Sequence, residues 1–244
     1  MGRKAADQRV SQLSDAYSGL ASIVRIAARA IARHGLAHAY GHCSARIDAK
    51  SFLVCPAKPM GLVRSIDQCT VVSLGDPFPD GVLGEVRIHR EIYRSRPDVG
   101  GVVRSMPPKV MSLAAMGLVP RPRHGFGSYF YPAPALWDDP QLLRTDEQAA
   151  ALADTLKQGR GILMRGNGVV TAGASLEEAV VLTWYLEDAA RIELDVLAAD
   201  RGDDSPVLSE TEAATRATWN GRIRERMWEY LTAEDPELLS AAAP

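Results

Sequence analysis

Apolar residues recur at three- and four-residue spacing over residues 14–34, and Gly35 follows them. This spacing predicts an amphipathic helix that ends at the glycine. The same spacing over residues 85–94 and 146–157 predicts two further helices. Each of these helices has one apolar face to bury, so the chain needs a common core.

Other helices are indicated by the residues at their first turns. Pro107 and Pro108 suit the start of a helix that runs to residue 116. Ser175 and Glu178 have capping-box spacing, which predicts a long helix ending near residue 199. A second serine–glutamate pair, in residues 209–212, opens a last helix that is notably polar.

Short apolar segments between turn residues predict the strands, and the first two of them read as a hairpin. Residues 119–136 are rich in proline, glycine and aromatics and are expected to form a loop that carries site residues, with one short strand. The predicted strands are residues 43–47, 51–55, 70–74, 101–104, 161–164 and 169–171, with the short one at 128–131.

Helices and strands mixed in this way predict an α/β protein, with one central sheet covered on both faces. The 244 residues are sufficient for a single domain over residues 1–244. We expect its core to span about residues 14–199 and a C-terminal helical extension to occupy residues 205–244.

Composition narrows the class of protein. Hydrophobic residues at 46% and charged residues at 24% are typical of a globular chain and exclude a disordered or coiled-coil protein. A net charge of −2 gives no general attraction to nucleic acid or to an anionic membrane. No apolar run is long enough for a leader or a membrane span. The three cysteines lack a CxxC pair, which favours a reducing cytoplasm over a disulfide framework.

Several strings occur in an order that resembles the class II aldolase/adducin family: GHCSAR at residues 41–46, residues 85–99, RGNG at 165–168 and SLEEA at 175–179. The GHxSAR string is closest to the branch that contains aromatic-acid decarboxylases. The resemblance implies a three-layer α/β/α sandwich with a mainly antiparallel or mixed sheet. It also implies a homo-oligomer, with a tetramer favoured and sites between subunits.

Typical members of that family hold a divalent metal with three histidines and use a glutamate as acid and base. Here the positions of the first two histidines read Arg104-Ser-Met106, and the third is Asn167. Guanidinium and thioether groups are poor ligands for such a cation. We therefore expect no metal and no cofactor, whereas the glutamate position is kept as Glu85.

Two catalytic candidates follow from this pattern. The resemblance implies that Glu85 moves the proton at the reacting carbon, although a carboxylate in a first helical turn is also favoured by the helix dipole alone. Arg104 ends a predicted buried strand and needs a partner there. It either pairs with Glu85 or supplies the positive charge that the metal gave, and both can hold together.

The loop over residues 119–136 adds weaker candidates. His124 is the third catalytic candidate, since a histidine titrates near neutral pH. Arg123 is a candidate for binding a carboxylate, because a guanidinium matches it in two parallel hydrogen bonds. Tyr129 is either a substrate contact or a core aromatic.

Three further residues are expected to bind substrate. Lys58 lies where sugar-phosphate members of the family contact their substrate, and His42 belongs to the GHxSAR string. Asn167 is either a substrate-binding amide or only a turn residue. The serines that those members place beside a phosphate are replaced by Leu83 and Gly84, which argues against a phosphorylated substrate.

These observations lead to one hypothesis and its alternatives. The hypothesis is a metal-independent carbon–carbon lyase, a decarboxylase or retro-aldol enzyme acting on a small, non-phosphorylated carboxylated substrate, either aromatic or a keto acid. The alternatives are an isomerase, cyclase or hydrolase on the same fold, or a non-catalytic binding protein like the adducin head. A partly polar pocket around Glu85 would favour an enzyme, and a filled core there would favour the binding protein.

Overall fold

Seven strands form one sheet in the computed structural model, which describes the backbone of residues 2–241 and the side chains of residues 17–240. Its order is β3-β2-β1-β4-β7-β6-β5, and every neighbouring pair is antiparallel except β5 and β6. The mixed sheet expected from the sequence is therefore confirmed. The strands are β1 (His42–Arg46), β2 (Ser51–Val54), β3 (Thr70–Ser73), β4 (Gly101–Ser105), β5 (Ala135–Trp137), β6 (Gly161–Met164) and β7 (Gly168–Gly173).

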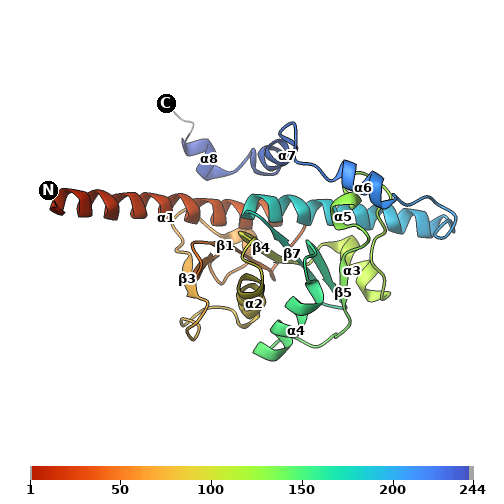
Figure 1. The fold of residues 1–244 in the computed structure, drawn as a ribbon, viewed down its shortest axis with the longest axis horizontal. Coiled ribbons are helices and arrows are strands. Elements are labelled where there is room, and N and C mark those ends of the chain that lie inside the picture. The colour runs from red at the N-terminus through yellow and green to blue at the C-terminus, as the bar shows by residue number, and fades with distance from the viewer. Residues whose placement is uncertain (1, 242–244) are drawn as a thin grey trace.

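Helices cover both faces of this sheet, giving three layers (Figure 1). The two long helices, α1 and α5, run along one face, where α3 also packs. The shorter α2 and α4 cover the opposite face. The bounds of these helices are α1 (Gly2–Arg33), α2 (Arg87–Ser95), α3 (Pro108–Ala115), α4 (Asp146–Leu156) and α5 (Leu176–Ala198).

Side chains along the central strands point alternately to the two faces of the sheet, and this divides the apolar core into two clusters. Cys43 and Ala45 of β1 contribute to the cluster under α1 and α5. Phe52 and Val54 of β2 and Val102 of β4 contribute to the cluster under α2 and α4. Because successive side chains on a strand point to opposite faces, the even-numbered residues of β1 and β4 lie on the α2 side.

The loop over residues 119–136 contains the main departure from the predicted elements. The strand expected at 128–131 is wrong: Gly127–Phe130 is a short 3₁₀ helix, and the strand of this region is β5, which follows it. Tyr129 and Phe130 are buried. Their aromatic composition suggested a strand because the same residue types favour sheets and cores.

The C-terminal extension also differs in detail from the single predicted helix. It forms three helices, α6 (Glu210–Arg216), α7 (Ile223–Thr232) and α8 (Pro236–Ala241). Gly221 and Arg222 have positive φ values of 71° and 59°, so the chain turns immediately before α7. Among the predicted helices, α1 also begins earlier than expected, at Gly2 rather than residue 14.

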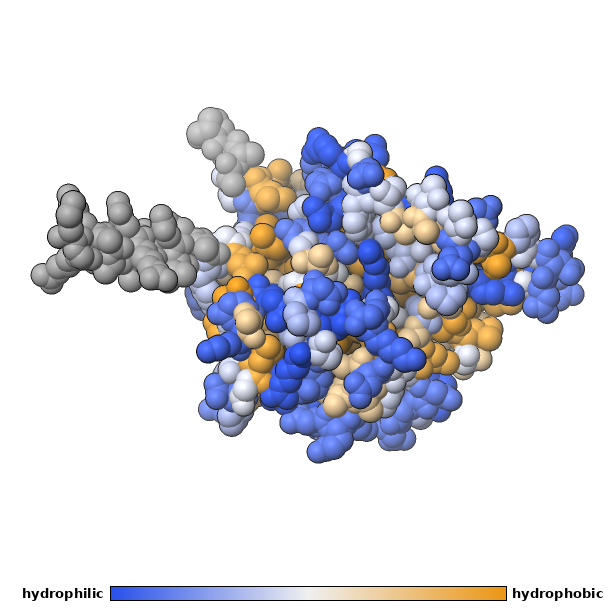
Figure 2. All heavy atoms as spheres, in the orientation of Figure 1, coloured by the Kyte–Doolittle hydropathy of each residue, from blue (hydrophilic) through white to orange (hydrophobic). Residues whose placement is uncertain are grey.

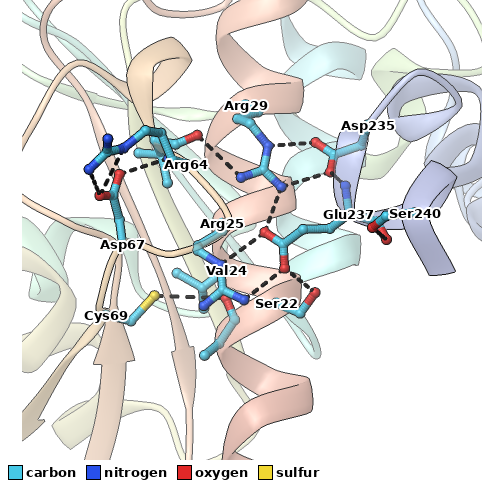
Figure 3. A network of polar contacts seen from close by, with 12 residues as sticks. Ser22, Val24, Arg25, Arg29, Arg64, Asp67, Cys69, Asp235, Glu237 and Ser240 are labelled. Atoms are coloured by element: carbon cyan, nitrogen blue, oxygen red, sulfur yellow. Dashed lines mark hydrogen bonds and ion pairs between the residues drawn. The ribbon is translucent and has the colours of Figure 1, made fainter.

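The C-terminal extension is tied to α1 by buried ion pairs (Figure 3). The guanidinium of Arg29 donates to both carboxylate oxygens of Asp235 at 2.7 Å. Arg25 and Arg29 both donate to Glu237, and so does the hydroxyl of Ser22. Residues more than 200 positions apart in sequence therefore lie side by side.

On the face drawn in Figure 2, hydrophilic residues cover most of the surface, and apolar residues lie between them in smaller groups. Of the described helices, none is long and apolar enough to cross a bilayer.

Candidate active site

A cleft of about 620 Å³ opens beside the ends of β1 and β4, and its wall is partly polar. Five of the residues singled out in the sequence meet there, although they come from five separate segments of the chain. These residues are His42, Lys58, Glu85, Arg104 and Asn167. The region around Glu85 is therefore an open pocket and not a filled core, as expected for a protein that binds a small ligand.

Strand register explains why these residues converge. His42, the first residue of β1, pairs directly with Arg104 of β4 in the antiparallel ladder. Arg104 in turn pairs with Val170 of β7, and Asn167 lies in the turn that leads into that strand. Glu85 comes from a 3₁₀ helix, Gly84–Val86, that leads into α2 on the same side of the sheet.

Glu85, Arg104 and Asn167 form a charged group at the floor of the cleft. Arg104 Nη2 lies 3.2 Å from Glu85 Oε2 and donates to Asn167 Oδ1 at 2.8 Å. Arg104 is only 3% exposed. Arg104 therefore pairs with Glu85 and also lines the cleft, while its predicted role as the charge that replaces the metal stays a prediction.

Two donors of this group remain without acceptors. Arg104 Nε and Asn167 Nδ2 are buried and have no hydrogen-bond partner among the described side chains. Buried donors of this kind are rare in native proteins, because the desolvated group loses its hydrogen bonds to water. Their position beside the cleft suits a ligand with negatively charged oxygens.

A second group of polar side chains lies behind the first. His42 Nδ1 is 2.8 Å from His89 Nε2, and His89 Nδ1 is 2.6 Å from Ser44 Oγ. Ser44 Oγ is 2.9 Å from the Tyr93 hydroxyl. His42 and Ser44 are two apart on β1 and share one face of the strand, whereas His89 and Tyr93 are four apart on α2 and share one face of the helix. These two faces are packed against each other, which brings the four side chains together.

Burial and neighbouring charges set the protonation of these groups. Burial lowers the pKa of His42 and lowers the pKa of His89 still further, so both rings are neutral near pH 7. Burial alone would raise the pKa of Glu85, but its polar neighbours, the Arg104 guanidinium among them, outweigh burial and lower that pKa. Glu85 is therefore a carboxylate in the unliganded site.

The cleft also contains residues that the sequence did not single out. Arg144 and Tyr40 line it. Arg144 lies in an irregular segment between β5 and α4, where no periodic pattern pointed to it. Lys58, at the rim, donates to Asp67 at 2.7 Å, so its charge is already paired.

The three candidates from the 119–136 loop lie away from this cleft within the chain. Arg123 pairs with Glu193 at 2.6 Å, and His124 lies 3.0 Å from Asp188. The Tyr129 hydroxyl donates to the Thr218 carbonyl, and its ring stacks near Trp219. Their predicted roles in the site stay predictions.

The residues present do not fit the three-histidine metal site that the family resemblance implies. The positions concerned hold Arg104, Met106 and Asn167, and Arg104 brings a fixed positive charge to the place of the cation. Among the side chains of residues 17–240, no group of three or more His, Cys, Asp or Glu is arranged to hold a metal ion.

The fold and the site together define a three-layer α/β/α protein with a charged ligand cleft at one end of its central strands. The family profile of the class II aldolase and adducin N-terminal domain matches residues 22–194. The chain belongs to this family.

Relatives of known activity narrow the comparison. The chain is 28% identical over 202 residues to a 3,4-dihydroxyphthalate decarboxylase from Arthrobacter keyseri, a match that covers 75% of this chain and 81% of the relative. It is 27% identical over 205 residues to the enzyme of the same name from Terrabacter sp., covering 77% and 85%.

Solved structures of the family support the fold. An L-fuculose 1-phosphate aldolase from Glaciozyma antarctica superposes with a TM-score of 0.74 at 20% identity, over 94% of this chain and 92% of that one. The L-fuculose-1-phosphate aldolase from Thermus thermophilus gives 0.67 at 25% identity, over 78% and 98%.

Proposed function

We propose that this protein is a metal-independent carbon–carbon lyase that decarboxylates a small, non-phosphorylated aromatic carboxylate. The observation that carries the proposal is the buried guanidinium of Arg104, paired with Glu85 and Asn167 at the floor of the cleft. The similarity to two 3,4-dihydroxyphthalate decarboxylases supports decarboxylation and favours hydroxylated aromatic acids as substrates.

Arg104 and Asn167 are the groups that bind the substrate's carboxylate or the oxyanion that develops during the reaction. Arg104 Nε and Asn167 Nδ2 are unused donors, and a preorganised donor of this kind contributes roughly 3–4 kcal/mol to transition-state stabilisation. Because the guanidinium is already held by Glu85 and Asn167, little side-chain entropy is lost when the ligand binds.

Glu85 supplies the proton. A carboxylate ligand on Arg104 neutralises the guanidinium and adds a like charge beside Glu85, so ligand binding raises the pKa of Glu85 and favours its protonated form. The ring carbon that bears the carboxylate takes the proton from Glu85, the carbon–carbon bond to the carboxylate breaks, its electron pair returns to the ring, and carbon dioxide leaves. One proton is consumed and no oxidant is needed.

The proposal is tested by incubating the protein with 3,4-dihydroxyphthalate and with mono- and dihydroxybenzoates while carbon dioxide and the decarboxylated product are measured. We expect Glu85→Gln to lower kcat by about 10²–10⁴-fold, as for loss of a general acid. Arg104→Ala should lower kcat by about 10²–10³-fold. Glu234→Gln, an exposed carboxylate outside the cleft, is the control and should leave turnover unchanged.

Two outcomes contradict the proposal. If both cleft variants keep wild-type turnover, Glu85 and Arg104 do not carry the reaction. If exhaustive dialysis against a chelator abolishes the activity and a divalent cation restores it, the reaction is not metal-independent.

A further inference from the structure

Four buried polar side chains form a chain of hydrogen bonds that begins at the cleft with His42. The reaction proposed above, in which Glu85 donates the proton, gives these side chains no role. His42 is 3% exposed, Tyr93 is 1% exposed, and Ser44 and His89 are inaccessible. Polar groups sealed off in this way have a fixed number of hydrogens to share, so the direction of each hydrogen bond can be worked out by counting them.

The count starts at Tyr93. Its hydroxyl lies 3.0 Å from the backbone carbonyl of Ser44, and a carbonyl oxygen only accepts, so Tyr93 donates its single hydrogen there. The same hydroxyl lies 2.9 Å from Ser44 Oγ. Either hydroxyl could donate in this second contact, but only the contact with the carbonyl needs Tyr93 as its donor, so we assign the Tyr93 hydrogen there and the Ser44 hydrogen to Tyr93.

The direction then passes to the two histidines. Ser44 Oγ has given its hydrogen to Tyr93, so it accepts from His89 Nδ1 at 2.6 Å. Burial holds the pKa of His89 well below its ordinary value, and a neutral ring carries one N–H. His89 Nε2 is therefore an acceptor, and His42 Nδ1 donates to it at 2.8 Å.

The result is an unprotonated nitrogen, His42 Nε2, at the cleft end of the hydrogen-bond chain. His42 is neutral and has its hydrogen on Nδ1, so its Nε2 is left unprotonated. This atom is buried and has no hydrogen-bond partner among the described side chains. Glu85 Oε2, 3.9 Å away, is itself an acceptor and does not satisfy it.

We propose that His42 is a second catalytic residue, a base whose Nε2 lone pair is kept open by the hydrogen-bond chain from Tyr93, and that it accepts the proton of a hydroxyl group on the carboxylated ring. The class of ligand rests on the proposed function, whereas the state of the ring follows from the hydrogen-bond chain and from the burial that keeps both rings neutral. Ser44, His89 and Tyr93 are positioning residues.

The step balances as a proton transfer. The ligand's O–H bond breaks, its electron pair stays on oxygen, and an N–H bond forms at His42 Nε2. The imidazolium is stabilised by the oxyanion that the transfer creates and opposed by the Arg104 guanidinium, while His89 accepts from its other nitrogen. The oxyanion pushes electrons into the ring, which makes the carbon that bears the carboxylate easier to protonate by Glu85.

The first test needs no activity. The chemical shifts of nitrogen-15-labelled histidine distinguish a protonated ring nitrogen from one with a lone pair, and His42→Gln assigns the signals. We expect His42 Nε2 to be unprotonated in the wild type. Tyr93→Phe frees the Ser44 hydrogen to be donated to His89, so His42 should become protonated at Nε2 in that variant. Ser44→Ala should have the same effect.

A protonated Nε2 in the wild type overturns the inference, as does an unprotonated one in both variants. Thr183→Val is the matched control. It removes a buried hydroxyl that bonds Thr171, on the side of the sheet that faces α5, so the state of His42 should not change.

The second test uses benzoate, 2-hydroxybenzoate and 3-hydroxybenzoate as ligands in calorimetry. At least one hydroxylated ligand should bind about threefold to tenfold tighter than benzoate, the effect of one hydrogen bond, and this preference should vanish in Ser44→Ala. A preference that is absent in the wild type or that survives in Ser44→Ala contradicts the inference. Failure of all three ligands to bind contradicts the proposed carboxylate site instead, and the nitrogen shifts still decide the state of His42.

Discussion

At the scale of single residues, the chemical character of the cleft depends on which of its polar atoms already have hydrogen-bond or ion-pair partners. Arg104 is buried, yet its charge is compensated by Glu85 at 3.2 Å and by the amide of Asn167. A buried ion pair adds little net stability compared with apolar residues, but removing one partner leaves a charge without compensation. The pair is therefore best explained by what it can do for a ligand.

This view predicts the effect of Glu85→Gln on stability. The variant leaves the Arg104 guanidinium without a carboxylate and should lower the free energy of unfolding by about 1–3 kcal/mol in urea denaturation at pH 7. Glu234→Gln, an exposed control, should change it by less than about 0.5 kcal/mol.

The pH dependence of this difference follows from the lowered pKa of Glu85. A carboxyl whose pKa is lower in the folded state stabilises the fold above its unfolded pKa and loses that contribution as the pH falls through its folded pKa. The wild type and Glu85→Gln should therefore converge in stability under acid conditions. A difference that stays constant down to acid pH would contradict the pairing.

At the scale of elements, close approach of backbones fixes how β4 meets α5. A Cβ built on Gly101 would lie 2.3 Å from the backbone Cα of Leu176, the first residue of α5. No side chain fits in that space without moving the helix. This contact sets the position of β4, and Arg104 stands at the far end of the same strand.

We therefore expect opposite results from two glycine-to-alanine changes. Gly101→Ala should destabilise the protein by about 1–3 kcal/mol or more, because backbone must shift to relieve the overlap. Gly19→Ala, in α1 with open space around its Cα, should stabilise by about 0.5–1 kcal/mol. Thermal unfolding checks both, and equal shifts in the two variants would show that the close approach has no consequence.

At the scale of the whole molecule, the ion pairs of Figure 3 join the two ends of the described chain. Asp235 is inaccessible and Arg29 is 7% exposed. Because α1 covers one face of the sheet, the same contacts hold the C-terminal extension against the core. The homo-oligomer implied by the family resemblance stays a prediction at this scale.

Removing the buried carboxylate should loosen this arrangement. Asp235→Ala leaves Arg29 with the Glu237 carboxylate and the Val63 carbonyl as partners and should lower the free energy of unfolding by about 3 kcal/mol. Arg191→Gln removes the half-exposed arginine that pairs with Asp188 and Asp195 and serves as the control, with an expected change within about 0.5 kcal/mol. If both variants unfold at the same urea concentration as the wild type, the ion pairs do not stabilise the extension.

Acid should weaken the same arrangement. Burial of Glu237 opposes ionisation, but hydrogen bonds from Arg25, Ser22 and Arg29 outweigh it and lower its pKa to about 2. The stability that Glu237 contributes is complete above the ordinary glutamate range and should be lost as the pH falls towards 2. Glu237→Gln should be less sensitive to pH over that interval.

The fold was largely predictable, because it depends on local patterns. Short apolar segments between turn residues located six of the seven strands, and three- and four-residue spacing together with first-turn residues located the main helices. The string containing His42, together with Glu85, pointed to the family. The misplaced strand at 128–131 shows where such patterns fail. Tyr129 and Phe130 are buried in a 3₁₀ helix, and burial selects the same residue types as a strand does.

The sequence by itself determined the order of elements and which residues have ionisable side chains, since both follow from the chain's local composition. Only the tertiary structure decided that His42 meets His89 and Glu85 while His124 turns to Asp188. The reason is geometric. Strand register and the placement of α2 against β1 set these distances, and residues far apart in sequence carry no local signal of which partner they will meet.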